Sequence, residues 1–237
     1  LKFALVFTLI VFAIALALSG VAVIDIAGAA GMALSAWLIA SVKLEWMQRV
    51  KLFQVPFADC LRRARALPRA SYGMSLAHMG MAMLIIGVTG SSAWKQENIL
   101  TMDVGETVDV AGFSITLDEA AIVPGANYEA LRGTFTAVQA TSSVTLTPER
   151  RVYDQPVQQT TEAAIHTLFW ADLYVVLGDG PDQDGRYVVR VFLEPFVPFL
   201  WYGVLMMGFG GLVSLSDRRY RVGPPRRLTV NPLAAEA

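Results

Sequence analysis

Residues 3–42 read FALVFTLIVFAIALALSGVAVIDIAGAAGMALSAWLIASV, an apolar stretch interrupted near its middle by Ser19 and Gly20. A membrane-spanning helix needs about 20 mostly apolar residues. The stretch therefore predicts two spans, residues 3–18 and 21–42, joined by a tight turn into a helical hairpin. A cleaved signal peptide is disfavoured, because no convincing small-residue cleavage site separates the two runs.

Two further apolar stretches, at about residues 72–94 and 196–215, are long enough to cross a membrane. Across the chain 54% of residues are hydrophobic and 16% are charged, which is too apolar for an ordinary soluble domain. We therefore predict a multi-pass α-helical membrane protein with four transmembrane helices. The first residue is Leu1 rather than Met, so we expect the chain to begin inside a longer gene product or after a processing cut.

The distribution of Lys and Arg predicts the orientation, because cytoplasmic loops are enriched in these residues. Two connecting segments are basic, with Lys43, Arg49, Lys51, Arg62, Arg63, Arg65 and Arg69 in one and Arg218, Arg219, Arg221, Arg226 and Arg227 in the other. Residues 94–195 instead carry six basic and fifteen acidic side chains, a net charge of −9. We expect a bacterial inner-membrane protein with a periplasmic domain.

The expected organisation is a transmembrane hairpin (1–43), a basic cytoplasmic loop (44–71), a transmembrane helix (72–94), a periplasmic domain (95–195), a last transmembrane helix (196–216) and a basic cytoplasmic tail (217–237). Within the periplasmic domain, residues 107–110 and 113–117 flank Ala111-Gly112 as a plausible hairpin. Further strands are expected within 133–147, 174–177 and 186–192. These short segments predict a small antiparallel β-sandwich or barrel.

Catalytic motifs are scarce. The sequence contains no HExxH, GxSxG, P-loop or Rossmann fingerprint. The single cysteine, Cys60, cannot form an internal disulfide. The two histidines are His78 and His166, and a lone histidine in an exposed domain, such as His166, is usually only a polar residue.

His78 is the main candidate site residue, because it lies about six residues inside the third predicted span. An ionisable side chain within a membrane is costly and is therefore a candidate functional residue. Neutral imidazole is a good ligand for haem iron. The nearby small and soft residues suit a flat cofactor but equally suit helix packing; they are Gly73, Met74, Ala77, Gly80, Met81, Ala82, Met83, Gly87 and Gly90. The spacing alone leaves both interpretations open.

Five phrases together resemble one family. They are AHMGMA at 77–82, TEAAI at 161–165, DLYVVLG at 172–178, EPFV at 194–197 and GFGGLVSLSDRR at 208–219. The chain resembles the C-terminal third of the cytochrome c-type biogenesis family CcmF, over nearly its whole length. The resemblance runs from the first hairpin to the Arg-rich tail, and the phrases DLYVVLG and GGLVSLSDRR are specific in combination.

The resemblance implies a component of a membrane cytochrome c haem lyase. Such a component accepts substrate haem from the periplasmic haem chaperone CcmE and works with the subunits CcmH and CcmI, which present apocytochrome c. Thioether bonds then form between the haem vinyl groups and the cysteines of a CxxCH motif. A fragment of this length is not expected to be active alone.

The resemblance also implies a haem b with two transmembrane histidine ligands, of which His78 matches the second. The other axial ligand, a tryptophan-rich segment and two periplasmic histidines would lie outside this chain. The family's phrase around His166 is more often completed by another residue, which argues against an essential role there. His78 would lie roughly 9 Å along a helix entered from the cytoplasm, at about 1.5 Å per residue. That depth suits electron entry from a reductant in the lipid bilayer such as quinol.

Two other interpretations remain open at this level. The chain could anchor a docking or scaffold domain that binds no cofactor, or it could be half of a transporter, which predicts broken helices and polar residues near the middle of the membrane. In each case the acidic domain should face partner proteins rather than nucleic acid, whose phosphates its net charge would repel.

Overall fold

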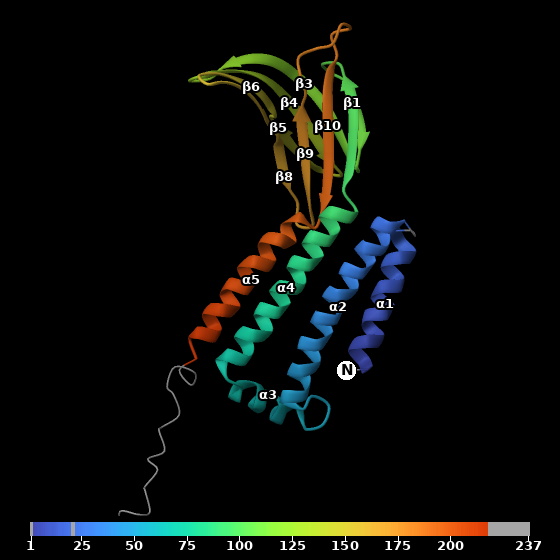
Figure 1. Ribbon diagram of the computed structural model, residues 1–237, viewed down its shortest axis with the longest axis vertical. Coiled ribbons are helices and arrows are strands. Elements are labelled where there is room, and N and C mark those ends of the chain that lie inside the picture. The colour runs from blue at the N-terminus through green and yellow to red at the C-terminus, as the bar shows by residue number, and fades with distance from the viewer. Residues whose placement is uncertain (1, 20–21, 218–237) are drawn as a thin grey trace, which may run out of the picture.

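The computed structural model describes residues 2–19 and 22–217. Four of its helices are long and apolar enough to cross a membrane: α1 (Lys2–Ser19), α2 (Val23–Val50), α4 (Arg69–Ala93) and α5 (Val197–Leu215). They lie side by side in the order α1, α2, α4, α5, with a β-sandwich at one end of the bundle (Figure 1). The predicted fold class is therefore confirmed: four long apolar helices, with an antiparallel β domain between the last two.

The segment expected as a basic loop is mostly helical. Helix α2 continues eight residues beyond position 42 and ends at Val50, which is fully buried. Lys51 then adopts a left-handed backbone with φ 56°, which stops the helix. A short helix, α3 (Phe57–Ala66), follows and lies across the lower end of the bundle between α2 and α4 (Figure 1).

Helices α4 and α5 approach each other at their backbones. A Cβ atom added to Gly80 would lie 2.6 Å from the carbonyl oxygen of Gly203, and one added to Gly203 would lie 2.6 Å from the carbonyl oxygen of Gly80. Gly73 and Gly210 form a second reciprocal pair one heptad away, and Gly87 lies against Leu200. Small residues permit this close packing in membranes, where van der Waals contact replaces the hydrophobic effect as the force between helices.

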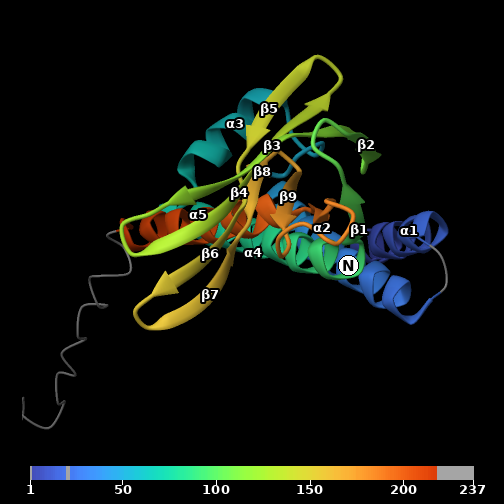
Figure 2. The same ribbon diagram turned by 90° about the horizontal axis from the view of Figure 1, so that it is seen from above.

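The sandwich contains two antiparallel sheets. The first has the order β1 (Gln96–Met102), β10 (Tyr187–Pro195), β9 (Ala171–Leu177) and β8 (Ala164–Thr167). The second has the order β2 (Thr107–Val110), β3 (Phe113–Pro124), β4 (Tyr128–Gln139), β6 (Glu149–Asp154) and β7 (Val157–Glu162), with β5 (Ser142–Leu146) also paired to β4. Viewed from above, the β6–β7 and β4–β5 hairpins extend toward opposite sides (Figure 2).

Alternating side chains from both sheets form the core of the sandwich. Its largest fully buried members are Met102, Ile115, Leu117, Phe135, Leu173, Leu177, Val175, Val189 and Val191. Ala111 and Gly112 connect β2 to β3 with φ values of 53° and 81°, the two left-handed residues that a tight type I′ hairpin turn requires. The expected stretch 133–147 contains parts of two strands, β4 and β5, and not one.

Chain connections fix the sandwich directly to the helices. Only two residues separate α4 from β1, and one residue separates β10 from α5. Phe196, in that one-residue link, has φ 64° and donates its N–H to the carbonyl oxygen of Trp170 at 2.6 Å. Lys95 forms an ion pair with Glu194 at 3.0 Å across the same junction. Helix α4 therefore leads directly into β1, and the neighbouring strand β10 leads directly into α5.

Candidate functional site

His78 is the tenth residue of the 25-residue helix α4, and its side chain is exposed on the helix surface. Its ring atom Nδ1 lies 2.8 Å from the carbonyl oxygen of Met74, one turn earlier. A carbonyl can only accept a hydrogen bond, so Nδ1 must carry the proton. In the neutral imidazole this leaves the Nε2 lone pair available, and a backbone carbonyl on the other ring nitrogen is the usual arrangement behind a metal-binding histidine.

The surroundings of His78 form an open apolar face of α4, which we define as Met74, His78, Met81 and Val88. All four side chains are exposed, and their spacing places them along one side of the helix. Polarisable thioethers on either side of an imidazole suit contact with a flat aromatic ligand. These residues therefore fit one half of a haem site, in which a second segment would close the other half.

The glycines of α4 belong to helix packing and not to this open face. Gly73, Gly80 and Gly87 all contact α5, on the side of α4 opposite to His78. Ala82 is fully buried, and its carbonyl oxygen accepts a hydrogen bond from Ser35 of α2 at 2.9 Å. Of the two interpretations that the spacing left open for the glycines, the packing interpretation is the one that the contacts support.

His166 lies far from this face, in strand β8 of the sandwich, where it pairs with Leu173 of β9 and is partly buried. It therefore does not join His78 in a common site. Among residues 2–19 and 22–217, no group of three or more His, Cys, Asp or Glu side chains is arranged to hold a metal ion. The membrane-spanning helices of the described structure therefore contain one exposed imidazole, that of His78, which could bind a haem iron.

Comparisons with known proteins agree on one family over most of the chain. The family described as "CcmF C-terminal beta-sandwich" matches residues 93–195. A cytochrome c-type biogenesis protein CycK from Bradyrhizobium diazoefficiens is 36% identical over 81% of this chain and 29% of its own length. CcmF from Pseudomonas aeruginosa is 37% identical over 80% of this chain and 28% of its own length.

The chain belongs to the CcmF family. It corresponds to the C-terminal region of these proteins, as the sequence phrases predicted, and spans about 30% of the length of the curated relatives that it matches. A solved structure titled "Cytochrome c Heme Lyase CcmF" has the same fold, with a TM-score of 0.63 over 90% of this chain and 34% of that chain. At 15% identity this likeness concerns the fold alone.

Two buried carboxylates in the sandwich of this CcmF-family chain were not singled out from the sequence. Glu149 lies between Arg132, whose Nε donates to it at 2.6 Å, and Arg151, whose Nε donates at 2.7 Å. Burial alone would raise the pKa of Glu149, but the hydrogen bonds and charges of both arginines outweigh burial and lower it. This cluster holds β6 against β4, and we assign it a structural role.

The second buried carboxylate, Asp172, stands at the end of β9 nearest the helices. It is 5% exposed, and its Oδ1 has no hydrogen-bond partner among the described residues. Burial raises the pKa of Asp172, the charge of the neighbouring Glu194 adds to this, and the hydroxyls of Thr167 and Tyr174 oppose it only in part. No motif marks such a residue, because its environment depends on strand pairing.

We predict that Asp172 makes the sandwich less stable as pH rises. An acid whose pKa is raised by folding binds its proton more tightly in the folded state. The contribution of Asp172 to stability is therefore fully present at and below the ordinary aspartate pKa of about 4, and it declines as pH rises through the raised value. Asp172→Asn should remove this decline. Hydrogen–deuterium exchange of β9 peptides in the full-length protein, corrected for intrinsic rates, measures it. An equally steep pH dependence in the Asn variant would contradict the assignment.

Proposed function

We propose that this chain is the C-terminal part of a membrane cytochrome c haem lyase, and that His78 supplies one axial ligand to a haem b. The observation that carries the proposal is the geometry of His78: Nδ1 is engaged by Met74, and the ring lies on an exposed apolar face. Membership of the CcmF family gives this geometry its context, because relatives of the chain are named for cytochrome c biogenesis and a structure of the same fold is titled a haem lyase.

In this proposal a second ligand to the haem iron would come from a segment outside this chain. A bound haem b would supply one-electron transfer, reducing the iron of the substrate haem before its attachment. The residues of this chain would hold and orient it: His78 through Nε2, and Met74, Met81 and Val88 through apolar contact. His78 precedes the midpoint of α4 on the side of α3, which suits a reductant such as quinol that enters from the bilayer.

The sandwich would serve as the docking domain for the protein partners, proposed to be CcmE, CcmH, CcmI and apocytochrome c. Its acidic charge supports recognition of basic protein surfaces and disfavours nucleic acid. The direct connections of β1 and β10 to α4 and α5 support a rigid link between this docking domain and the helix that carries His78.

We predict that the two ends of the bundle lie on opposite sides of the bacterial inner membrane, with the sandwich in the periplasm. A reporter that is active only in the periplasm should be active when fused after Gly180, in the β9–β10 connection, and silent when fused after Arg65 in α3. The physical reason is the excess of Lys and Arg at the α3 end. The opposite pattern of activity would overturn the orientation. The basic tail from residue 218 onward lies outside the described residues.

The functional test is an absorption spectrum of membranes that contain the full-length protein. A reduced-minus-oxidised b-type band that scales with protein level is expected if the protein holds haem b. A docking scaffold that binds no cofactor would show no such band, although it would still be needed for cytochrome c maturation. Strains that lack the protein provide the baseline.

A further inference from the structure

Helix α3 carries apolar side chains that the rest of the described structure leaves uncovered. One side of the helix is used internally, where Cys60 is buried and its Sγ approaches the carbonyl oxygens of Lys51 and Val55 at 3.8 and 3.7 Å. Next to this side, Phe57 is 77% exposed and Leu61, one turn later, is 42% exposed. Arg65 follows Leu61 by one turn on the same side, and Arg62 and Arg63 lie on the remaining sides of the helix.

This pattern is that of a helix lying in a membrane surface. An amphipathic helix of this kind places its apolar side among acyl chains and its basic side among headgroups. Helix α3 also has the position that such a helix requires, because it crosses the bundle at the ends of the membrane-spanning helices α2 and α4 (Figure 1). Phe53, in the preceding turn, is 88% exposed and extends the apolar surface.

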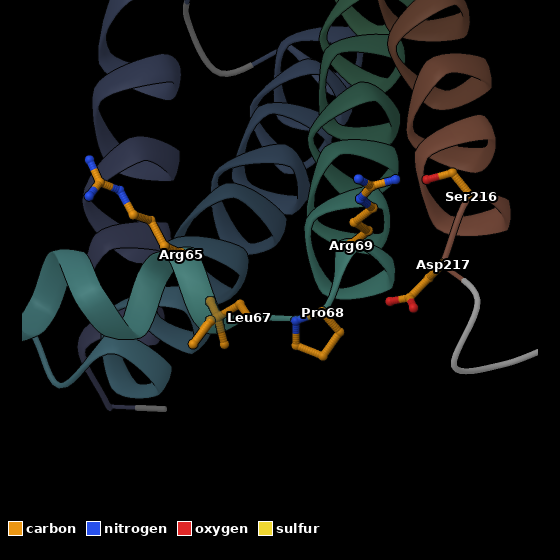
Figure 3. Close-up of a pocket in the computed structure, with 7 residues that line it drawn as sticks. Arg65, Leu67, Pro68, Arg69, Ser216 and Asp217 are labelled. Atoms are coloured by element: carbon orange, nitrogen blue, oxygen red, sulfur yellow. The ribbon is translucent and has the colours of Figure 1, made fainter.

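A cavity of about 650 Å³ lies beside α3 at the same level. Its lining comes from the end of α3, the start of α4 and the end of α5, and consists of Arg65, Ala66, Leu67, Pro68, Arg69, Ser216 and Asp217 (Figure 3). Asp217 is buried and accepts a hydrogen bond from the backbone N–H of Ala70 at 3.1 Å, so it caps the start of α4. The cavity is therefore lined by two arginines and by the start of α4, whose free N–H at Ala70 is already bound by Asp217.

The arginines around this cavity differ from one another in their pairing. Arg62 forms an ion pair with Asp59 at 3.0 Å, and Arg49 forms one with Glu45. Arg63, Arg65 and Arg69 form no ion pair with any carboxylate in the described parts of the chain, and of these three only Arg65 and Arg69 line the cavity. Both guanidinium groups are thus available to an anion.

We propose that this cavity binds an anionic phospholipid of the surrounding bilayer. The phosphate lies in the cavity between Arg65 and Arg69. Their side chains stand on different sides of it and point apart in the structure, so each turns inward to bring its guanidinium group to the phosphate oxygens (Figure 3). The acyl chains run past Phe57 and Leu61. Basic pockets between membrane helices at the headgroup level are suited to such lipids. The lipid thereby fixes α3 against the start of α4, the helix that carries His78. This inference does not depend on haem binding.

Native mass spectrometry of the full-length protein, released from nanodiscs of phosphatidylcholine with phosphatidylglycerol, tests the proposal. The wild-type protein should retain phosphatidylglycerol. The double variant Arg65→Gln/Arg69→Gln should retain roughly 25-fold less, since each basic residue near an anionic surface contributes about fivefold. The matched control Arg62→Gln/Arg63→Gln removes two charges from the same helix but lines no part of the cavity. Equal losses in the two double variants would overturn the site.

Two further measurements distinguish a bound lipid from the two other possible occupants, a free phosphate ion and another protein segment. Millimolar inorganic phosphate should leave lipid retention unchanged, and displacement by phosphate would mean a simple anion site. A spin label introduced by Phe57→Cys, with Cys60→Ala as background, should be accessible to dissolved oxygen and shielded from a water-soluble nickel complex. Shielding from both would show that another protein segment covers α3 and would overturn the lipid proposal.

Discussion

Replacement of His78 by alanine is expected to remove most of the b-type haem from the full-length protein and to reduce cytochrome c maturation with it. Loss of a hydrogen-bond partner behind a metal ligand already costs about 10- to 100-fold in affinity, so loss of the ligand itself should cost at least tenfold. Haem content by the pyridine haemochrome assay, together with the level of a matured cytochrome c in the same cells, measures both effects.

Matched controls make this result specific. Val204→Ala truncates a half-exposed apolar side chain of α5, outside the open apolar face, without removing a donor atom, and it should keep both haem and maturation near normal. His166→Ala removes the other histidine, which lies in β8 away from this face, and should also be near normal. His78→Cys is expected to retain some haem with an altered potential, because thiolate and imidazole donate differently to iron. If the His78→Ala variant kept its full haem content, His78 would not be a ligand, and the role of this part of α4 would be helix packing.

Gly203→Val is expected to produce the largest loss of stability. A side chain at Gly203 would meet the carbonyl oxygen of Gly80 at 2.6 Å and the backbone nitrogen of Leu84 at 2.7 Å. Backbone atoms cannot rotate away, so α4 and α5 must separate along their length. Overpacking typically costs about 1–3 kcal/mol, and backbone clashes place this substitution at the upper end or beyond.

Gly208→Val, five residues later in α5, is the matched control. A Cβ atom at Gly208 would have no described neighbour within 4 Å, so the same chemical change should be tolerated there. The melting temperature of the full-length protein in detergent, followed by size-exclusion chromatography after heating, compares the two variants. Equal melting temperatures would mean that the α4–α5 contact does not limit stability.

The helices and the general class of the exposed domain could be predicted from the sequence because the physics there is local. Long apolar runs identify spans whatever they pack against. Helix α2 was underestimated because Lys43 and Glu45 resemble the start of a loop, whereas the helix continues to bury Val50 beneath the bundle.

The sequence missed β1, β6, β7 and β8, and the reason lies in their positions. Strands β6 and β7 read ERRVYD and VQQTTE, and their hairpin extends beyond the core, so no apolar alternation marks them (Figure 2). Strand β8 has four residues, too few to show a period. The predicted strand 113–117 covers only the first part of β3, because the register of β3 shifts between Leu117 and Glu119.

The sequence identified the residue at the centre of the candidate site, but it could not predict how the residues around it are arranged. The cost of an imidazole within a span identified His78, but spacing could not separate haem contact from helix packing for the glycines around it. That separation requires knowing which side of α4 meets α5. The orientation of Gly80 toward Gly203 supplies it, and leaves Met74, His78, Met81 and Val88 as the open apolar face.

The ligand role of His78 is tested most directly by electron paramagnetic resonance of the oxidised full-length protein carrying His78→Gly, recorded with and without added imidazole. The proposal predicts a six-coordinate low-spin haem b signal in the wild type, its loss or conversion to high spin in the variant, and recovery of the low-spin signal when free imidazole occupies the position of the missing ring. A low-spin signal in His78→Gly that is identical to that of the wild type without imidazole would show that His78 does not bind the iron.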